Sequence, residues 1–111
     1  MREVDLDTFA SAYEHGAEVI DVREPMEYVA GHVPGARLIP MGQLPSRLAE
    51  LPKGEPVYVI CASGNRSLSM ADFLASSGYD AWSVAGGTGL WMRTGRRVVA
   101  GMQAGERESA A

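Results

Sequence analysis

The feature of this sequence that most constrains its fold is a short apolar run that passes through a tight loop into a helical pattern. Residues 57–60, Val-Tyr-Val-Ile, are apolar and either β-branched or aromatic, which is typical of a central parallel strand covered on both faces. Residues 61–67, Cys-Ala-Ser-Gly-Asn-Arg-Ser, follow at once and open the helical pattern. Because ligands bind at the carboxyl ends of strands in open α/β sheets, Cys61 is predicted to lie at a ligand-binding edge.

The loop that begins at Cys61 has the composition expected around a reactive thiol. A loop this short directs several backbone N–H groups at one point, and the following helix adds roughly half a positive charge there. Such surroundings lower a cysteine pKa from about 8.5 to roughly 3.5–7.5, and Arg66 acts in the same direction if its guanidinium faces the loop. Gly64 suits the positive φ that a sharp bend usually requires. A lone cysteine after a strand is more often a small buried hydrophobe, but the combined pattern favours a nucleophile.

Strand-like and helical patterns alternate along the rest of the chain. We expect strands at residues 18–22, 36–39, 57–60 and 81–84. We expect helices at residues 6–13, 26–30, 44–51, from the loop to Gly78, and around residues 90–92. This alternation predicts an α/β domain with a mainly parallel central sheet flanked by helices on both faces. Residues 1–99 are predicted to form this single domain, and residues 100–111, which lack periodicity, a flexible C-terminal tail.

Composition excludes several classes of function. The chain has 111 residues, a net charge of -4 and a pI near 5.1, which argue against a nucleic-acid partner. No apolar stretch approaches the roughly 18–20 residues of a membrane span, and the acidic start lacks a signal peptide, so we expect a cytoplasmic protein. A single cysteine excludes an internal disulfide, and the two histidines, His15 and His32, lack metal-ligand spacing. Neither a metal nor another cofactor is predicted.

Two pairs of charged residues precede the loop in the sequence. The strand at residues 18–22 would deliver Asp21 and Arg23 to the same sheet edge as Cys61 if the strands run parallel. They are expected to support the site, or else to form a structural ion pair that orders this edge. Glu24 and Glu27 would share one face of the next helix, where a solvated surface is the expected role.

Four sequence elements resemble the signatures of the rhodanese-like sulfurtransferases, small single-domain type. In that family the active loop reads cysteine, four intervening residues and arginine, as residues 61–66 do here. Residues 21–24, Asp-Val-Arg-Glu, resemble its first signature, and residues 31–36, Gly-His-Val-Pro-Gly-Ala, its second. Gly86-Gly87 followed by Trp91 resembles the pattern after its last strand. The resemblance therefore implies a rhodanese-like fold, with His32 in a structural turn.

The closing segment departs from the family pattern. Many members have a proline before the valine that follows the last helix, whereas residues 95–99 here read Gly-Arg-Arg-Val-Val. The basic cluster formed by Arg93, Arg96 and Arg97 could meet an acidic partner, although solvated cations near a helix carboxyl end are the simpler interpretation.

The resemblance implies sulfur transfer through a persulfide on Cys61. The thiolate would take the outer sulfur of thiosulfate or a similar donor and pass it to a thiol or cyanide acceptor. The site residues implied besides Cys61 are the rest of the loop, namely Ala62, Ser63, Gly64, Asn65, Arg66 and Ser67. Their N–H groups, the Arg66 charge and the Ser67 hydroxyl would hold the sulfur and its donor.

Two other functions remain open from the sequence. The domain could be a persulfide carrier or sensory module that a partner loads, with a cysteine desulfurase or a thioredoxin-like protein as candidate partners. A remote alternative is a cysteine-dependent phosphatase or arsenate reductase. Those phosphatases place five residues between cysteine and arginine, however, and this loop has four.

Overall fold

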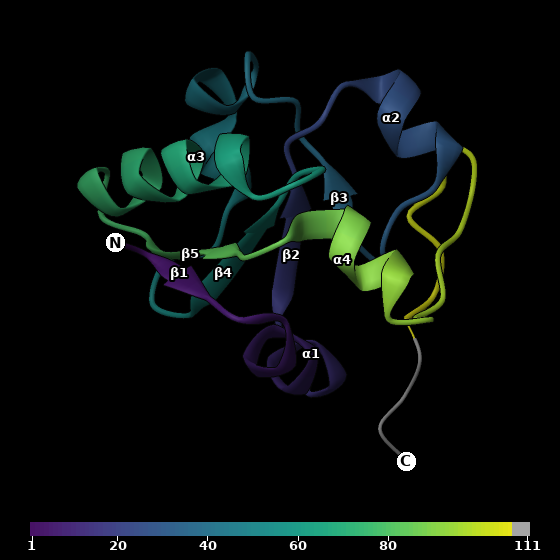
Figure 1. Ribbon diagram of the computed structural model, residues 1–111. Helices are drawn as coiled ribbons and strands as arrows, with labels where there is room; N and C mark the ends of the chain where they lie inside the picture. Colours follow the sequence, from purple (N-terminus) through teal and green to yellow (C-terminus); the bar gives the residue numbers. More distant parts are fainter. Residues whose placement is uncertain (108–111) are drawn as a thin grey trace.

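The computed structural model describes residues 1–107 and has a parallel sheet at its centre (Figure 1). The sheet is five-stranded with the order β1-β5-β4-β2-β3, and each pair of neighbours is parallel. Its strands are β1 Glu3–Val4, β2 Glu18–Asp21, β3 Arg37–Leu38, β4 Pro56–Ile60 and β5 Asp80–Val84. The helices are α1 Leu6–Glu14, α2 Pro25–Ala30, α3 Asn65–Ser76 and α4 Gly87–Arg93, with a 3-10 helix, η1, at Leu44–Glu50. The predicted α/β class with a mainly parallel sheet is confirmed.

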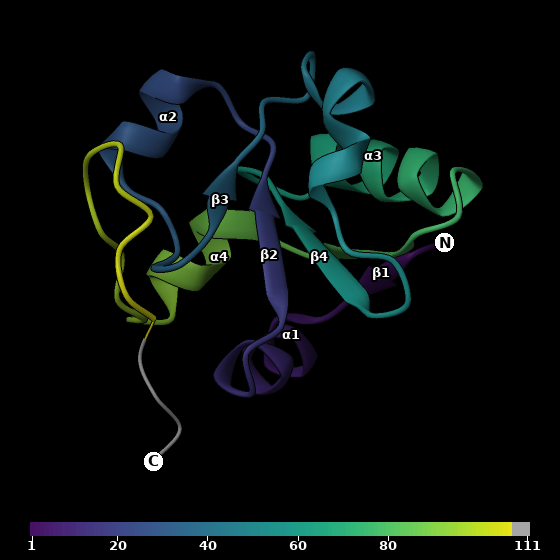
Figure 2. The same ribbon diagram turned by 180° about the vertical axis from the view of Figure 1, so that it is seen from behind.

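Side chains alternate between two cores along β4, as a strand covered on both faces requires. Val57 and Val59 pack into the core beneath α3 and η1, whereas Tyr58 and Ile60 pack into the core that α1 and α4 cover. Figures 1 and 2 show these helices on opposite sides of the sheet. The sheet is therefore buried on both faces, so a binding site can form only at the ends of its strands.

Local sequence signals account for the helix ends. The side chain of Asp5 caps α1 by accepting a hydrogen bond from the backbone N–H of Thr8 at 2.8 Å. Pro25 occupies the first turn of α2, where its missing N–H costs no hydrogen bond. The segment at residues 44–51 differs from expectation: its leucine stripe is carried by a 3-10 helix that is kinked at Arg47 rather than by a regular α-helix.

The segment after α4 differs from the expected loose tail. Val99 and His32 exchange backbone hydrogen bonds of 2.9 Å, and the N–H of Gly35 donates to the carbonyl of Ala104 at 2.8 Å. The Arg107 guanidinium donates to the carbonyls of Tyr13 and Ala17 and lies over the Tyr13 ring. Residues 100–107 are thus held against the domain. Most of these contacts use backbone groups, so they require no periodic pattern of side chains in the sequence. Residues 108–111 of the predicted tail lie outside the described residues.

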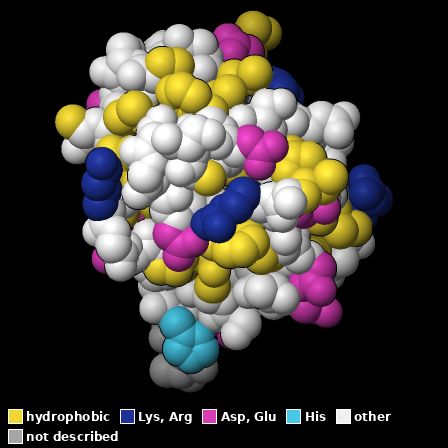
Figure 3. Space-filling view, turned by 90° about the vertical axis from the view of Figure 1, so that its left-hand side faces the viewer, with side chains coloured by type: hydrophobic (Ala, Val, Ile, Leu, Met, Phe, Trp, Pro, Cys, Tyr) yellow, Lys and Arg dark blue, Asp and Glu magenta, His cyan; other side chains and the backbone are white. Residues whose placement is uncertain are grey.

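Residues 1–107 carry charged side chains of both signs at the surface. No helix in this range is long and apolar enough to cross a membrane, and no group of three or more His, Cys, Asp and Glu side chains could hold a metal ion. On the face drawn in Figure 3, cationic and anionic side chains are interspersed. Arg2 and Asp80 form one of the surface ion pairs. His32 is buried, stacked on the Tyr28 ring at a centroid distance of 3.6 Å, and hydrogen-bonded to backbone carbonyls, which agrees with the structural turn implied for it.

Candidate active site

The loop between β4 and α3 wraps around the Cys61 thiol. The backbone N–H of Gly64 donates to Cys61 Sγ at 3.1 Å, and that of Ser67 does so at 3.3 Å. Gly64 reaches the required bend with φ of 106°, in the left-handed region that favours glycine. Cys61 is only 1% exposed, so its sulfur lies at the base of the loop with amides directed inward. Ser63 and Asn65 form the exposed rim of this loop.

Hydrogen bonds outweigh burial in setting the acidity of this thiol. Burial alone raises the pKa of Cys61, because the thiolate loses its hydration. The Ser67 hydroxyl and the backbone N–H groups of Ser67, Gly64 and Ser63 act in the opposite direction. The net result is a pKa below the ordinary value for cysteine, and a thiolate that is the better nucleophile.

A buried serine on β5, which the sequence reasoning missed, extends this network. The Oγ atoms of Ser67 and Ser83 lie 2.8 Å apart, and Ser67 Oγ lies 3.3 Å from Cys61 Sγ. Ser83 is fully buried. When Cys61 is ionised, the Ser67 hydroxyl donates to the sulfur and can accept from Ser83 in turn. The one available signal was a polar residue inside the apolar strand of residues 81–84.

Removing the Ser67 hydroxyl is expected to raise the pKa of Cys61. In Ser67→Ala, the rate of alkylation by iodoacetamide should follow a curve shifted to higher pH, because the thiolate loses its side-chain donor. Ser69→Ala, an exposed serine of the same helix, is the matched control. Equal pH curves for the wild type and Ser67→Ala would show that the hydroxyl does not stabilise the thiolate.

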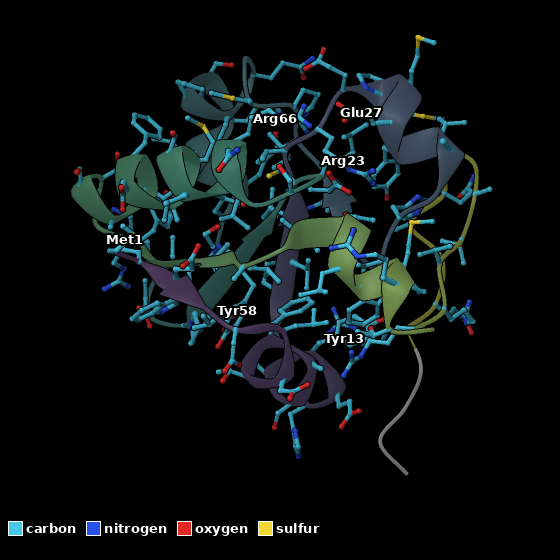
Figure 4. All side chains as sticks on the ribbon, viewed as in Figure 1. Met1, Tyr13, Arg23, Glu27, Tyr58 and Arg66 are labelled. Atoms are coloured by element: carbon cyan, nitrogen blue, oxygen red, sulfur yellow. The ribbon has the colours of Figure 1, made fainter. Side chains whose placement is uncertain are left out.

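Arg66 lies at the loop but is bound to a carboxylate of α2. Its Nη1 and Nη2 atoms donate to the two Glu27 oxygens at 2.8 and 2.9 Å. These hydrogen bonds lower the pKa of Glu27 to about 2 and raise that of Arg66. The result corrects one expectation: Glu27 is not part of a merely solvated face, because it forms an ion pair with Arg66 and compensates part of its charge. Figure 4 shows Arg66 and Glu27 together above the sheet, with Arg23 nearby.

Asp21 and Arg23 form a buried ion pair at the same sheet edge. The strand register places Asp21 beside Ile60, the residue before Cys61. The Asp21 carboxylate accepts from Arg23 Nε at 3.0 Å and from Nη2 at 2.8 Å, and Nη2 also donates to the Gly31 carbonyl. Both side chains are therefore engaged with each other and with the backbone at the end of α2. Of the two roles expected for Asp21 and Arg23, support of the site or a structural ion pair, this geometry favours the structural ion pair.

The first turn of α4 packs directly on the loop, and two glycines permit it. The N–H of Thr88 donates to the Cys61 carbonyl at 2.8 Å, and that of Gly89 to the Ala62 carbonyl at 3.0 Å. A Cβ on Gly87 would lie 2.4 Å from the Cys61 carbonyl oxygen, a severe overlap. Gly86, the preceding residue, likewise has a positive φ of 80°. The glycine pair noted in the sequence therefore allows α4 to hold the backbone of Cys61.

Gly87→Ala is expected to destabilise the fold by about 2–4 kcal/mol, because a Cβ would overlap the Cys61 carbonyl and residue 87 has positive φ. Gly95→Ala is the matched control, since Gly95 also has positive φ but nothing lies within 4 Å of a Cβ there. Urea denaturation of both variants measures the difference. Similar losses in the two variants would show that backbone strain alone, and not packing on the loop, requires glycine at position 87.

Comparison with known proteins agrees with this arrangement. A family model described as the rhodanese-like domain matches residues 5–94. A protein named sulfurtransferase from Allochromatium vinosum is 32% identical over 103 residues, which cover 90% of this chain and 96% of that protein. The thiosulfate sulfurtransferase GlpE of Pseudomonas paraeruginosa is 37% identical over 79 residues, which cover 70% of this chain and 72% of the GlpE chain.

A solved structure shows the same fold. The crystal structure of a rhodanese-related protein from Thermoplasma volcanium is similar to this chain with a TM-score of 0.84 and 30% sequence identity. The similarity covers 93% of this chain and 100% of the Thermoplasma chain. With the family match over residues 5–94, these relatives show that the chain belongs to the rhodanese-like sulfurtransferase family, as one small domain.

Proposed function

We propose that this protein is a thiosulfate sulfurtransferase that carries the transferred sulfur as a persulfide on Cys61. The observation that carries the proposal is the convergence of two backbone N–H donors on the sulfur, Gly64 N at 3.1 Å and Ser67 N at 3.3 Å. Donors fixed by the backbone stabilise a negatively charged sulfur without reorganising during the reaction. The relatives named sulfurtransferase and thiosulfate sulfurtransferase support the same activity.

The proposed reaction is a double displacement. The Cys61 thiolate attacks the outer sulfur of thiosulfate, the S–S bond of the donor breaks, and its electron pair leaves with sulfite. The charged terminal sulfur of the new persulfide is held by the N–H groups of the loop, Ala62 to Ser67, and by the Ser67 hydroxyl. A thiol or cyanide acceptor then attacks that terminal sulfur and releases the Cys61 thiolate. A cytoplasmic setting is part of the proposal, because a reducing compartment keeps a single thiol free.

Steady-state kinetics with thiosulfate and cyanide test the proposal. We expect thiocyanate and sulfite in equal amounts, and parallel double-reciprocal plots, because sulfite leaves before cyanide reacts. A phosphate ester measured beside thiosulfate tests the remote phosphatase alternative. Intersecting plots would contradict a persulfide intermediate, and turnover of the phosphate ester alone would replace the proposed activity.

A persulfide carrier loaded by a partner protein is the second candidate. The observation that favours it is the pairing of Arg66 with Glu27 and of Arg23 with Asp21, which leaves little free positive charge to attract a small anionic donor. A cysteine desulfurase with free cysteine would then load Cys61 much faster than thiosulfate does, and a thioredoxin-like protein could remove the sulfur. Comparing the two loading rates in the same buffer separates the enzyme from the carrier.

A further inference from the structure

The proposed donor is a dianion, yet the protein offers it little free positive charge at the loop. The chain carries a net charge of -4, which repels an approaching anion. The two arginines beside the loop are both compensated, Arg66 by Glu27 and Arg23 by Asp21. The rim residues Ser63 and Asn65 are uncharged. A donor such as thiosulfate would therefore need another cation.

Arg93, at the end of α4, is a cation in a suitable place. Its Nη1 atom lies 3.4 Å from the point where a Cβ on Gly89 would be, and the Ala62 carbonyl oxygen lies 3.1 Å from the same point. Helical side chains lean toward the amino terminus, so a residue four positions after Gly89 covers that glycine. The Arg93 guanidinium thus lies over the first turn of α4, next to the residue that follows Cys61.

Arg93 also differs from its neighbours in the basic cluster. It is exposed, and within residues 1–107 the structure gives it no ion pair. Arg96 instead lies over the Trp91 ring and within 3.6 Å of an Asp7 carboxylate oxygen. Arg97 donates to the Glu106 carbonyl. The three arginines therefore have different contacts, and Arg93 is the one directed toward the active loop.

We propose that Arg93 is a specificity-determining residue that binds the anionic group of the sulfur donor at the rim of the loop. This inference rests on the proposed function for its substrate and concerns which residue attracts that substrate. The guanidinium offers a forked pair of N–H donors that matches the oxygens of a sulfonate-like group. Arg66, held by Glu27, is instead a positioning residue that ties α2 to the loop.

A charge series of donors tests this role. In Arg93→Gln, the KM for thiosulfate should rise about three- to tenfold with little change in kcat, because an exposed charge contact contributes to donor binding. The increase should be smaller for the monoanion methanethiosulfonate, and the rate of Cys61 alkylation by the neutral reagent iodoacetamide should not change. Arg93→Lys should keep part of the preference for thiosulfate. Arg96→Gln, which removes the same charge from the same cluster, should match the wild type.

Three results would overturn the inference: an unchanged KM for thiosulfate in Arg93→Gln, an equal increase for the dianionic and the monoanionic donor, or an equal effect in Arg96→Gln. Protection of Cys61 from iodoacetamide by sulfate gives the same comparison without turnover. Weaker protection in Arg93→Gln alone supports the anion site, and equal protection in all variants contradicts it. Failure of every donor to load the wild type would refute the proposed function separately, because the protection assay does not depend on sulfur transfer.

Discussion

Cys61→Ser is expected to lower the rate of thiocyanate formation from thiosulfate and cyanide by at least about a thousandfold. The serine hydroxyl can occupy the same loop and accept from Gly64 and Ser67, which now donate to the sulfur at 3.1 and 3.3 Å. It cannot ionise near neutral pH or form a bond equivalent to the persulfide. Binding should survive while chemistry is lost.

Circular dichroism and urea denaturation provide the structural control for this variant. Because serine is smaller and more polar than cysteine and residue 61 is buried, a loss of about 1–2 kcal/mol is expected without a change of fold. Ser67→Ala, with its sulfur nucleophile intact, should retain measurable turnover. Residual activity in Cys61→Ser comparable to that of Ser67→Ala would mean that Cys61 does not carry the sulfur.

Asp21→Asn is expected to cause the largest loss of stability, about 3–5 kcal/mol, because it leaves the Arg23 charge buried without its partner. Asp21 is fully buried and Arg23 is 6% exposed. Three charge-assisted hydrogen bonds join these side chains, and together they use both oxygens of the carboxylate. Urea denaturation measures the change, with the exposed Asp72→Asn as the matched control.

The same variant separates the two roles expected for this pair. If Asp21 and Arg23 only order the sheet edge, the folded Asp21→Asn protein should show the same pH curve for Cys61 alkylation as the wild type. A loss of less than about 1 kcal/mol together with a large fall in sulfur transfer would instead assign these residues to the reaction. Low temperature and the absence of urea keep enough of the variant folded to measure both the alkylation curve and the rate of sulfur transfer.

Features that depend on adjacent residues could be predicted from the sequence. The strand at residues 57–60, the bend at Gly64 and the helix after it follow from apolar runs, glycine and helical spacing within one short segment. The alternation of strands and helices likewise predicts the parallel sheet. The position of Cys61 at the end of a central strand therefore needed no tertiary information.

Contacts between distant segments could not be predicted in the same way. Glu27 meets Arg66 across 39 positions of the chain, and Ser83 meets Ser67 across 16. A carboxylate on a short helix is usually solvated, so its sequence gives no sign of the arginine it will bind. Residues 100–107 are held through backbone carbonyls and N–H groups, which every sequence possesses.

We expect the inward-facing amides of the loop to stabilise a second sulfur on Cys61. Intact-protein mass spectrometry after exposure to thiosulfate tests it most directly. We expect the mass to increase by one sulfur atom, a reductant to reverse the increase, and Cys61→Ser to show no increase. A wild-type protein whose mass stays unchanged with thiosulfate and every other sulfane donor, and with a cysteine desulfurase, would contradict it.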